Sequence, residues 1–192
     1  MAKIKIIVLS HYLFDEKMRD LHLNDDNVEN ENSAFISIIG TEECLKYWVH
    51  ENDNHYFKDH PNVLNLEFDD IGVDVIYNGH YFKTMHIDQG EKAFEFIENM
   101  ISSGKDTFYI HCKAGYSRSR AFGEFIYRYC MENDIEVYYE DRNDFTTMYN
   151  VWVFNVLNHV YCKKYRLKWY SEDNSDYIEE IKTPSIREIN RH

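Results

Sequence analysis

The chain has little proline and little glycine, with two prolines and seven glycines among its 192 residues. It also has no low-complexity tract and no internal repeat. Linkers between domains are usually rich in such residues or tracts, so we expect one compact domain. A chain of this length with 44% hydrophobic residues can bury a substantial core. We expect this domain to span residues 1–168, and the charged, weakly periodic residues 169–192 to form an extension on its surface.

Long apolar runs are also missing. The N-terminal sequence MAKIKIIVLSHY contains an apolar run of about five residues, which is too short for a signal-peptide core and lacks a small-residue cleavage site. No stretch of the sequence approaches the roughly 20 apolar residues that span a bilayer. We therefore expect a soluble protein without a membrane partner, whose N-terminal run is a first strand.

Basic residues are outnumbered, with 21 Lys and Arg against 34 Asp and Glu and a net charge of −13. Proteins that bind nucleic acids need basic side chains to neutralise phosphates, so we expect no nucleic-acid partner. Any phosphate site must then be locally positive. The cysteines are widely separated and include no CxxC pair: Cys44, Cys112, Cys130 and Cys162. This spacing argues against a disulfide framework or a zinc ribbon, and a reducing cytoplasm is the expected compartment.

Four short β-prone runs cover residues 3–10, 34–40, 63–68 and 107–112. They are mostly continuous apolar runs, which is typical of strands covered on both faces. Apolar residues at helical spacing predict helices over residues 88–101, from Arg118 or Ser119 onward, and over about 147–165. Asp88 and Glu91 are the expected capping pair of the first of these. The order predicts an α/β fold with a central, mostly parallel sheet of four to five strands flanked by helices.

The segment FYIHCKAGYSRSR carries the clearest chemical signal, because it contains the pattern H-C-x-x-G-x-x-R-S. Of the four cysteines, only Cys112 has an arginine six positions later. His111, Gly115 and Ser119 complete the pattern, and the chance of all these residues matching by accident is roughly 10⁻⁵.

A tight loop between a strand and a helix can turn its backbone N–H groups inward and form an anion site at the helix N-terminus. Gly115 would permit the backbone angles of such a turn. The same field favours the thiolate form of Cys112, which would make it a nucleophile. Arg118 can hold two phosphoryl oxygens in a bidentate fork. Ser119 can donate to the sulfur, and His111 is expected to support the loop through its ring nitrogens. The expected phosphate-binding residues are Lys113, Ala114, Gly115, Tyr116, Ser117 and Arg118.

The run HCKAGYSRS resembles the signature loop of the protein tyrosine phosphatase superfamily, in particular its small dual-specificity members of bacterial and viral type. The resemblance implies that Cys112 is the nucleophile, Arg118 the phosphate clamp and Ser119 the aid to thiolate departure. In such members an F-x-D sequence upstream supplies the general acid, and here Asp70 is the matching position. Asp69 and Asp88 remain the alternatives.

The sequence also departs from the larger classical members of this superfamily, because it has no Trp-Pro-Asp loop and no tyrosine-recognition loop. Residues 71–87 are expected to form a loop beside the site, and Tyr77, Tyr81 and Phe82 either contact substrate or pack on the body. Arg120 either adds positive potential at the rim or forms a surface ion pair. Asn150 resembles a family position and is expected to be structural.

The leading hypothesis is a monomeric phosphatase without cofactor or metal. It would hydrolyse phosphotyrosine, phosphoserine or phosphothreonine on proteins through a phosphocysteine intermediate. The alternatives are a phosphatase for a phosphoinositide, a nucleotide or an RNA 5′ phosphate, and a non-catalytic module that binds phosphoproteins.

Overall fold

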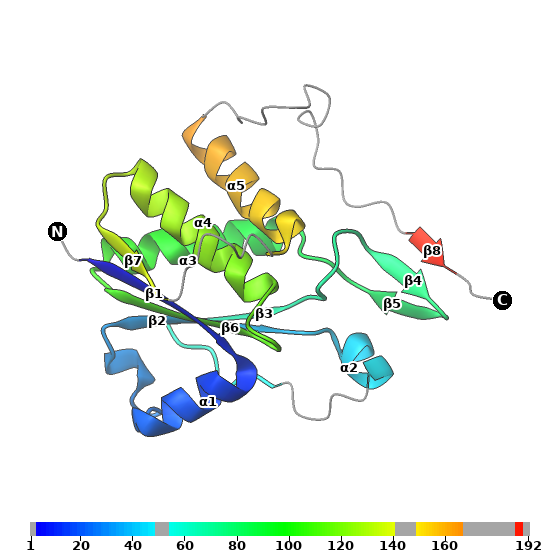
Figure 1. Cartoon of the computed structure of the whole chain (residues 1–192), viewed down its shortest axis with the longest axis horizontal. Coiled ribbons are helices and arrows are strands. Elements are labelled where there is room, and N and C mark those ends of the chain that lie inside the picture. Colours follow the sequence, from blue (N-terminus) through cyan, green and yellow to red (C-terminus); the bar gives the residue numbers. More distant parts are fainter. Residues whose placement is uncertain (1–2, 49–53, 141–148, 167–186, 190–192) are drawn as a thin grey trace.

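The computed structural model describes residues 3–48, 54–140, 149–166 and 187–189 (Figure 1). The strands are β1 (Ile4–Ser10), β2 (Ser33–Ile39), β3 (Val63–Glu67), β4 (Val75–Tyr77), β5 (His80–Phe82), β6 (Thr107–Cys112), β7 (Val137–Tyr139) and β8 (Arg187–Ile189). The helices are α1 (His11–Asp20), α2 (Glu42–Trp48), α3 (Ile87–Ser102), α4 (Arg118–Glu132) and α5 (Val151–Tyr165), with a short 3-10 helix, η1 (Val28–Asn30).

Five strands form a central sheet in the order β3-β2-β6-β1-β7, and every neighbouring pair is parallel. Helices cover this sheet, so the expected α/β class is confirmed. The four strands expected from the apolar runs are present with shifts of at most one residue at their ends. The fifth strand, β7, agrees with the expected four to five strands, but no strand was assigned to its three residues from the sequence.

Both faces of the sheet are covered, which explains the continuous apolar runs. Helices α3, α4 and α5 lie on one face and α1 lies on the other (Figure 1). Successive residues of β2 point to opposite faces of the sheet. Ile36 belongs to the core under α3, α4 and α5, whereas Phe35 packs with Phe14 and Met18 of α1. Most of the apolar residues that recur at helical spacing in these three helices are buried there.

The strand order places a topological switch point between β1 and β6. These two strands are neighbours, and Ser10 at the end of β1 pairs with Cys112 at the end of β6. The chain leaves β1 into α1 on one face and leaves β6 into α4 on the other (Figure 1). Adjacent strands whose following helices diverge leave a crevice at their carboxyl ends, where α/β proteins usually bind ligands.

Residues 71–87 are not the expected loop, because they contain the hairpin of β4 and β5. Its two-residue turn is Asn78-Gly79, and both residues have positive φ, which suits the right-handed twist of the strands. The hairpin joins β8 in a second, three-stranded sheet. Apart from β8, the expected C-terminal extension over 169–192 lies outside the described residues.

The hairpin is attached to the body by its aromatic side chains. The Tyr47 ring of α2 meets Tyr77 and Phe82 edge to face, with ring centroids 5.7 and 5.5 Å apart. Tyr81 donates its hydroxyl to the buried carboxylate of Asp74 at 2.6 Å, and this hydrogen bond raises the pKa of Tyr81 to about 12. Of the two roles considered for these aromatics, Tyr77 and Phe82 make packing contacts, whereas Tyr81 is exposed and hydrogen-bonded to Asp74.

Two helix starts differ from the expected ones. Helix α3 begins at Ile87, and the side-chain oxygen of Gln89 accepts from the N–H of His86, so the Asp88–Glu91 capping pair is wrong. Helix α5 begins at Val151, later than the expected position near 147, because Asn150 caps it by accepting from the N–H of Val153. Residues 147 and 148 lie outside the described part of the chain.

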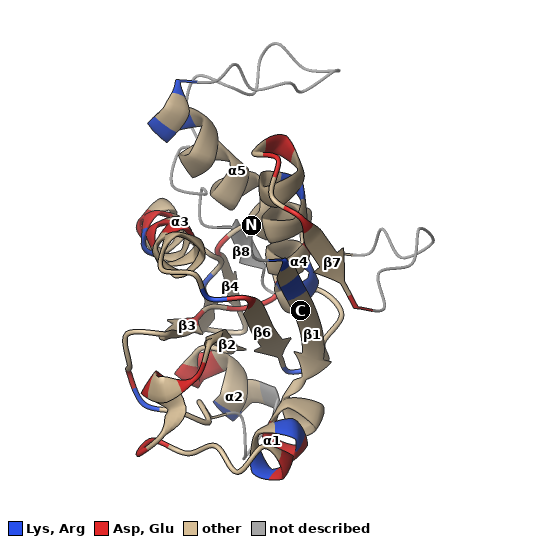
Figure 2. Ribbon diagram, turned by 90° about the vertical axis from the view of Figure 1, so that its left-hand side faces the viewer, with Lys and Arg blue, Asp and Glu red and all other residues tan. Residues whose placement is uncertain are grey.

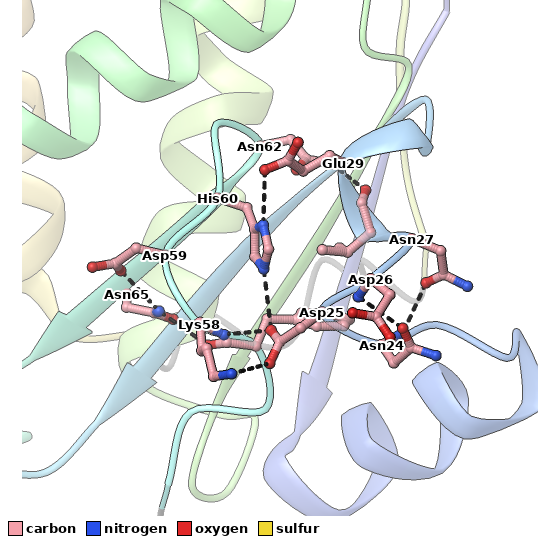
Figure 3. Close-up of polar contacts among 12 residues, drawn as sticks. Asn24, Asp25, Asp26, Asn27, Glu29, Lys58, Asp59, His60, Asn62 and Asn65 are labelled. Atoms are coloured by element: carbon pink, nitrogen blue, oxygen red, sulfur yellow. Dashed lines mark hydrogen bonds and ion pairs between the residues drawn. The ribbon is translucent and has the colours of Figure 1, made fainter.

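A polar cluster joins two loops near the amino ends of β2 and β3 (Figure 3). His60 lies between two carboxylates, with Nδ1 at 3.0 Å from Glu29 and Nε2 at 3.1 Å from Asp25. Lys58 donates its backbone N–H to Asp25 at 2.8 Å, and the Asn62 amide donates to the carbonyls of Val28 and Ser33. Hydrogen bonds to Glu29 and then Asp25 raise the pKa of His60. We call Asp25, Glu29, Lys58, His60 and Asn62 the amino-edge cluster.

Within the described residues, the helices fall short of the length and apolar character that crossing a bilayer requires.

Candidate active site

The loop from Cys112 to Arg118, here called the signature loop, lies directly on the end of β1. Gly115 has φ of +74°, and a Cβ at this position would lie 2.6 Å from the Ser10 nitrogen and 2.7 Å from the Leu9 carbonyl carbon. Both the backbone angle and the close approach therefore require glycine. The N–H of His11 also donates to the Lys113 carbonyl at 3.3 Å. The signature loop thus occupies the crevice between β1 and β6.

Cys112 ends β6, and only 2% of its surface is exposed. Its Sγ lies 3.1 Å from the hydroxyl oxygen of Ser119, which is in the first turn of α4 and fully buried. This is the pairing expected from the pattern, since a hydroxyl at this distance can donate to a thiolate. The strand end and the helix start therefore bring both groups together across the signature loop.

The start of α4 is basic and has no side-chain cap. Arg118 and Arg120 lie in its first turn, and Figure 2 shows basic residues of α4 in blue. Ser117 is the N-cap residue, but its side chain makes no capping bond and donates to Asp70 instead. The first N–H groups of a helix have no partner within the helix, and they favour an anion there.

Arg118 is a buried cation. It is 6% exposed, and its Nη1 donates to the Phe68 carbonyl at the end of β3 at 2.7 Å. Its Nε has no hydrogen-bond partner, and among the described residues Arg118 forms no ion pair with a carboxylate. Burying a charge is costly unless it is paired, so this guanidinium is suited to an anionic ligand.

Two neighbouring aspartates follow β3 and have different surroundings. Asp69 is buried, and its carboxylate accepts from the N–H and hydroxyl of Thr41 and from the N–H of Lys83, at 2.8 to 3.1 Å. These donors occupy both of its oxygens. Asp69 therefore holds the ends of β2, β3 and β5 together, which gives it a structural role.

Asp70 is exposed and lies against the signature loop. Its Oδ1 accepts from the Ser117 hydroxyl at 2.7 Å and from the Asn150 side-chain amide at 2.8 Å. Asp88 lies in the first turn of α3. Of the three acids considered, Asp70 is the one with a hydrogen bond to the signature loop among the described residues.

His111 is completely buried behind Cys112. Within the described part of the chain neither ring nitrogen has a hydrogen-bond partner, so the expected support through these nitrogens is not seen. The ring packs instead on Phe14, with centroids 4.2 Å apart. Burial, and then the neighbouring His11, His55 and Arg118, hold the pKa of His111 well below its ordinary value. The ring is therefore neutral near pH 7 and adds no charge to the site.

The remaining residues of the signature loop form its outer side. Ala114 and Tyr116 are exposed, and Lys113 is partly exposed. The guanidinium of Arg120 lies 5.4 Å from the centroid of the Tyr116 ring, a cation–π contact. Of the two roles considered for Arg120, the ion pair is not seen among the described residues.

Sequence reasoning missed Thr41 and the side-chain contact of Asn150. Thr41 follows β2 at the carboxyl edge of the sheet, the edge where α/β proteins place functional loops, so its position was a usable signal. The contact of Asn150 joins residues 80 positions apart and had no such signal.

No group of three or more His, Cys, Asp or Glu side chains in the described ranges is arranged to hold a metal ion. Comparisons with known proteins found no matching family model, no matching curated protein and no matching solved structure.

Proposed function

We propose that the chain is a cysteine-dependent phosphatase that hydrolyses phosphomonoesters on proteins or peptides. The observation that carries this proposal is the buried Arg118, which has no carboxylate partner among the described residues. It belongs to the signature loop, as Cys112 does, and precedes Ser119, whose hydroxyl lies beside the sulfur. The uncapped start of α4 supports it as well, because its N–H groups favour a bound anion.

In the first step, the Cys112 thiolate attacks phosphorus and forms a sulfur–phosphorus bond. The bond from phosphorus to the leaving oxygen breaks, and Asp70 gives that oxygen its proton, an effect typically worth about 10² to 10⁴ in rate. Arg118 and the N–H groups of the signature loop stabilise the charge on the phosphoryl oxygens.

In the second step, water attacks the phosphocysteine. Asp70, now ionised, takes a proton from the water while the sulfur–phosphorus bond breaks. Ser119 donates to the departing Cys112 thiolate at the distance seen in the structure and stabilises it. The products are inorganic phosphate and the free enzyme.

The charge of the chain bears on its substrates and surroundings. With a net charge of −13, the protein repels acidic peptides at long range, so phosphoresidues in neutral or basic contexts are the favoured substrates. The four cysteines, all within the described residues, form no disulfide bond. A reducing compartment such as the cytoplasm suits a thiolate nucleophile, which oxidants would otherwise inactivate.

The test is hydrolysis of p-nitrophenyl phosphate in the presence of a chelator. Wild type is expected to release phosphate, and Cys112→Ser is expected to be inactive. Cys162→Ser is the matched control, because Cys162 lies in α5 outside the site and its loss should leave the rate unchanged. If wild type is inert while Cys112→Ser still binds a phosphopeptide, the chain is a binding module and not an enzyme.

A further inference from the structure

We propose that Asn150 positions the general acid: it holds Oδ1 of Asp70, so that the catalytic proton resides on Oδ2. This inference rests on the proposed phosphatase function. It assigns to Asn150 a role in the reaction in addition to its cap of α5.

The two hydrogen bonds to Asp70 end on the same atom. Ser117 donates to Oδ1 at 2.7 Å and Asn150 donates to Oδ1 at 2.8 Å, whereas Oδ2 has no hydrogen-bond partner among the described residues. A carboxylate oxygen has two lone pairs, and two donors occupy both. A proton on Oδ1 would displace one donor, so it goes to Oδ2.

Asp70 needs such support because its surroundings do little to fix it. The side chain is exposed, and the contacts it makes through Oδ1 are the ones that can select a rotamer. An exposed carboxyl without these contacts would sample several rotamers, and only a fraction of them would aim the proton at the leaving oxygen.

Asn150 is itself held by two further hydrogen bonds. Its side-chain oxygen accepts from the N–H of Val153 at 3.0 Å, and its own N–H donates to the Ser117 carbonyl at 3.2 Å. These bonds leave the side-chain NH₂ directed at Asp70 and, more weakly, at the Ile71 carbonyl at 3.5 Å. The residue therefore fixes the acid relative to both the signature loop and α5.

Asp69 shows what a carboxylate without this arrangement looks like. Donors from Thr41 and Lys83 occupy both of its oxygens, so neither oxygen is left to carry a transferable proton. The difference between the two aspartates lies in which oxygens are occupied.

The experiment compares two leaving groups in the full-length protein. Phenol is a much weaker acid than p-nitrophenol, so phenyl phosphate depends on the general acid far more than p-nitrophenyl phosphate does. The readout is the ratio of kcat/KM for p-nitrophenyl phosphate to kcat/KM for phenyl phosphate. A purely structural defect lowers both rates together and leaves this ratio unchanged.

Asn150→Ser keeps a helix-capping oxygen but removes the amide that reaches Asp70. We expect this variant to raise the ratio about tenfold, in the same direction as Asp70→Asn and by less. Asn150→Asp also keeps the cap and lacks the donor, and it should shift the ratio in the same direction. Asn133→Ser, which alters an amide at the end of α4 remote from the signature loop, is the matched control and should leave the ratio unchanged.

An unchanged ratio in the folded Asn150→Ser and Asn150→Asp proteins would overturn the inference, whatever the size of the common loss in rate. Equal ratios in wild type and Asp70→Asn would overturn it too, since Asp70 would then not be the acid. If wild type hydrolyses neither ester, the proposed function itself fails. The three failures are therefore distinguishable.

Discussion

Charged side chains at the amino ends of the central strands are paired with one another, whereas a buried charge at the carboxyl ends is not. In the amino-edge cluster, His60 lies between two carboxylates and Lys58 pairs with Asp25 (Figure 3). At the carboxyl edge, Arg118 is more deeply buried than any charged residue of that cluster, yet its one side-chain hydrogen bond among the described residues is to a carbonyl. A polar network that satisfies itself stabilises the fold, whereas a buried charge left open is suited to binding a ligand.

The largest difference in activity is expected between substitutions of Arg118 and of Lys58. Arg118→Met should lower kcat/KM for p-nitrophenyl phosphate by about 10³ or more, because the clamp on the transition state is lost. It should also raise the free energy of unfolding by about 1 kcal/mol, because a buried unpaired charge is removed. Kinetics and urea unfolding measure the two effects.

Lys58→Met is the matched change at the amino edge. It should leave the rate unchanged and change the stability by less than about 1 kcal/mol, because its ion pair is on the surface. Equal losses of activity in the two variants would contradict the contrast between the edges.

The two aspartates after β3, Asp69 and Asp70, are expected to respond differently to the same substitution. Asp70→Asn should lower the rate on phenyl phosphate by about 10²-fold or more with little change in melting temperature. Asp69→Asn should lower the melting temperature, because the new amide cannot accept from every donor that now surrounds it. The reverse outcome would make Asp69 the acid.

Gly115 and Gly104 have similar φ angles but different surroundings, so substituting each distinguishes backbone strain from a steric clash. Gly115→Ala and Gly104→Ala both place a side chain at positive φ, +74° and +84°. A Cβ at Gly104 would have no atom within 4 Å, so Gly104→Ala should cost only about 1 to 2 kcal/mol of backbone strain. Gly115→Ala also meets the backbone of β1 and should cost more, with loss of activity. Chemical denaturation of both variants checks this difference, and equal costs would argue against a loop seated on β1.

The smallest expected effects are opposite pH dependences of two histidines. The pKa of His60 is raised above 6.5, so its stabilisation is fully present below about pH 6.5 and is lost as the pH rises through the folded value. The pKa of His111 is depressed, so the unfolded chain binds a proton first and stability falls as the pH falls below about 6.5.

Unfolding free energies between about pH 5 and pH 9 test both signs. His60→Gln should flatten the decline on the alkaline side, and His111→Leu should flatten the decline on the acid side. If His60→Gln instead flattened the decline on the acid side, the raised pKa of His60 would be wrong.

The local part of the candidate site was predictable from the sequence, and the part assembled over long distances was not. Cys112 ends a strand and Ser119 lies in the first turn of the next helix, so their spacing alone implies that they meet, and their side chains are 3.1 Å apart. The contact between Arg118 and Phe68 joins residues 50 positions apart, and it depends on β3 being two strands away from β6. Spacing along the chain carries no information on such a contact.

The missed elements have different causes. The Asn78-Gly79 pair is a strong hairpin signal, and the short apolar runs beside it were interpreted as a loop. Helix α1 buries only Phe14 and Met18, so its apolar face is too narrow to stand out in the sequence. Strand β7 has three residues, which is too short for any alternation to be read.

The close packing of Gly115 on the backbone of Leu9 and Ser10 determines which sequence changes in β1 the signature loop can accept. The atoms that would touch the added methyl group belong to the main chain, so the floor of the loop does not depend on which side chains those two residues carry. It depends instead on the length of β1. Deleting one residue from that strand would move its carboxyl end back by about 3.3 Å, away from the loop. Every strand residue beyond the deletion would then point to the opposite face of the sheet.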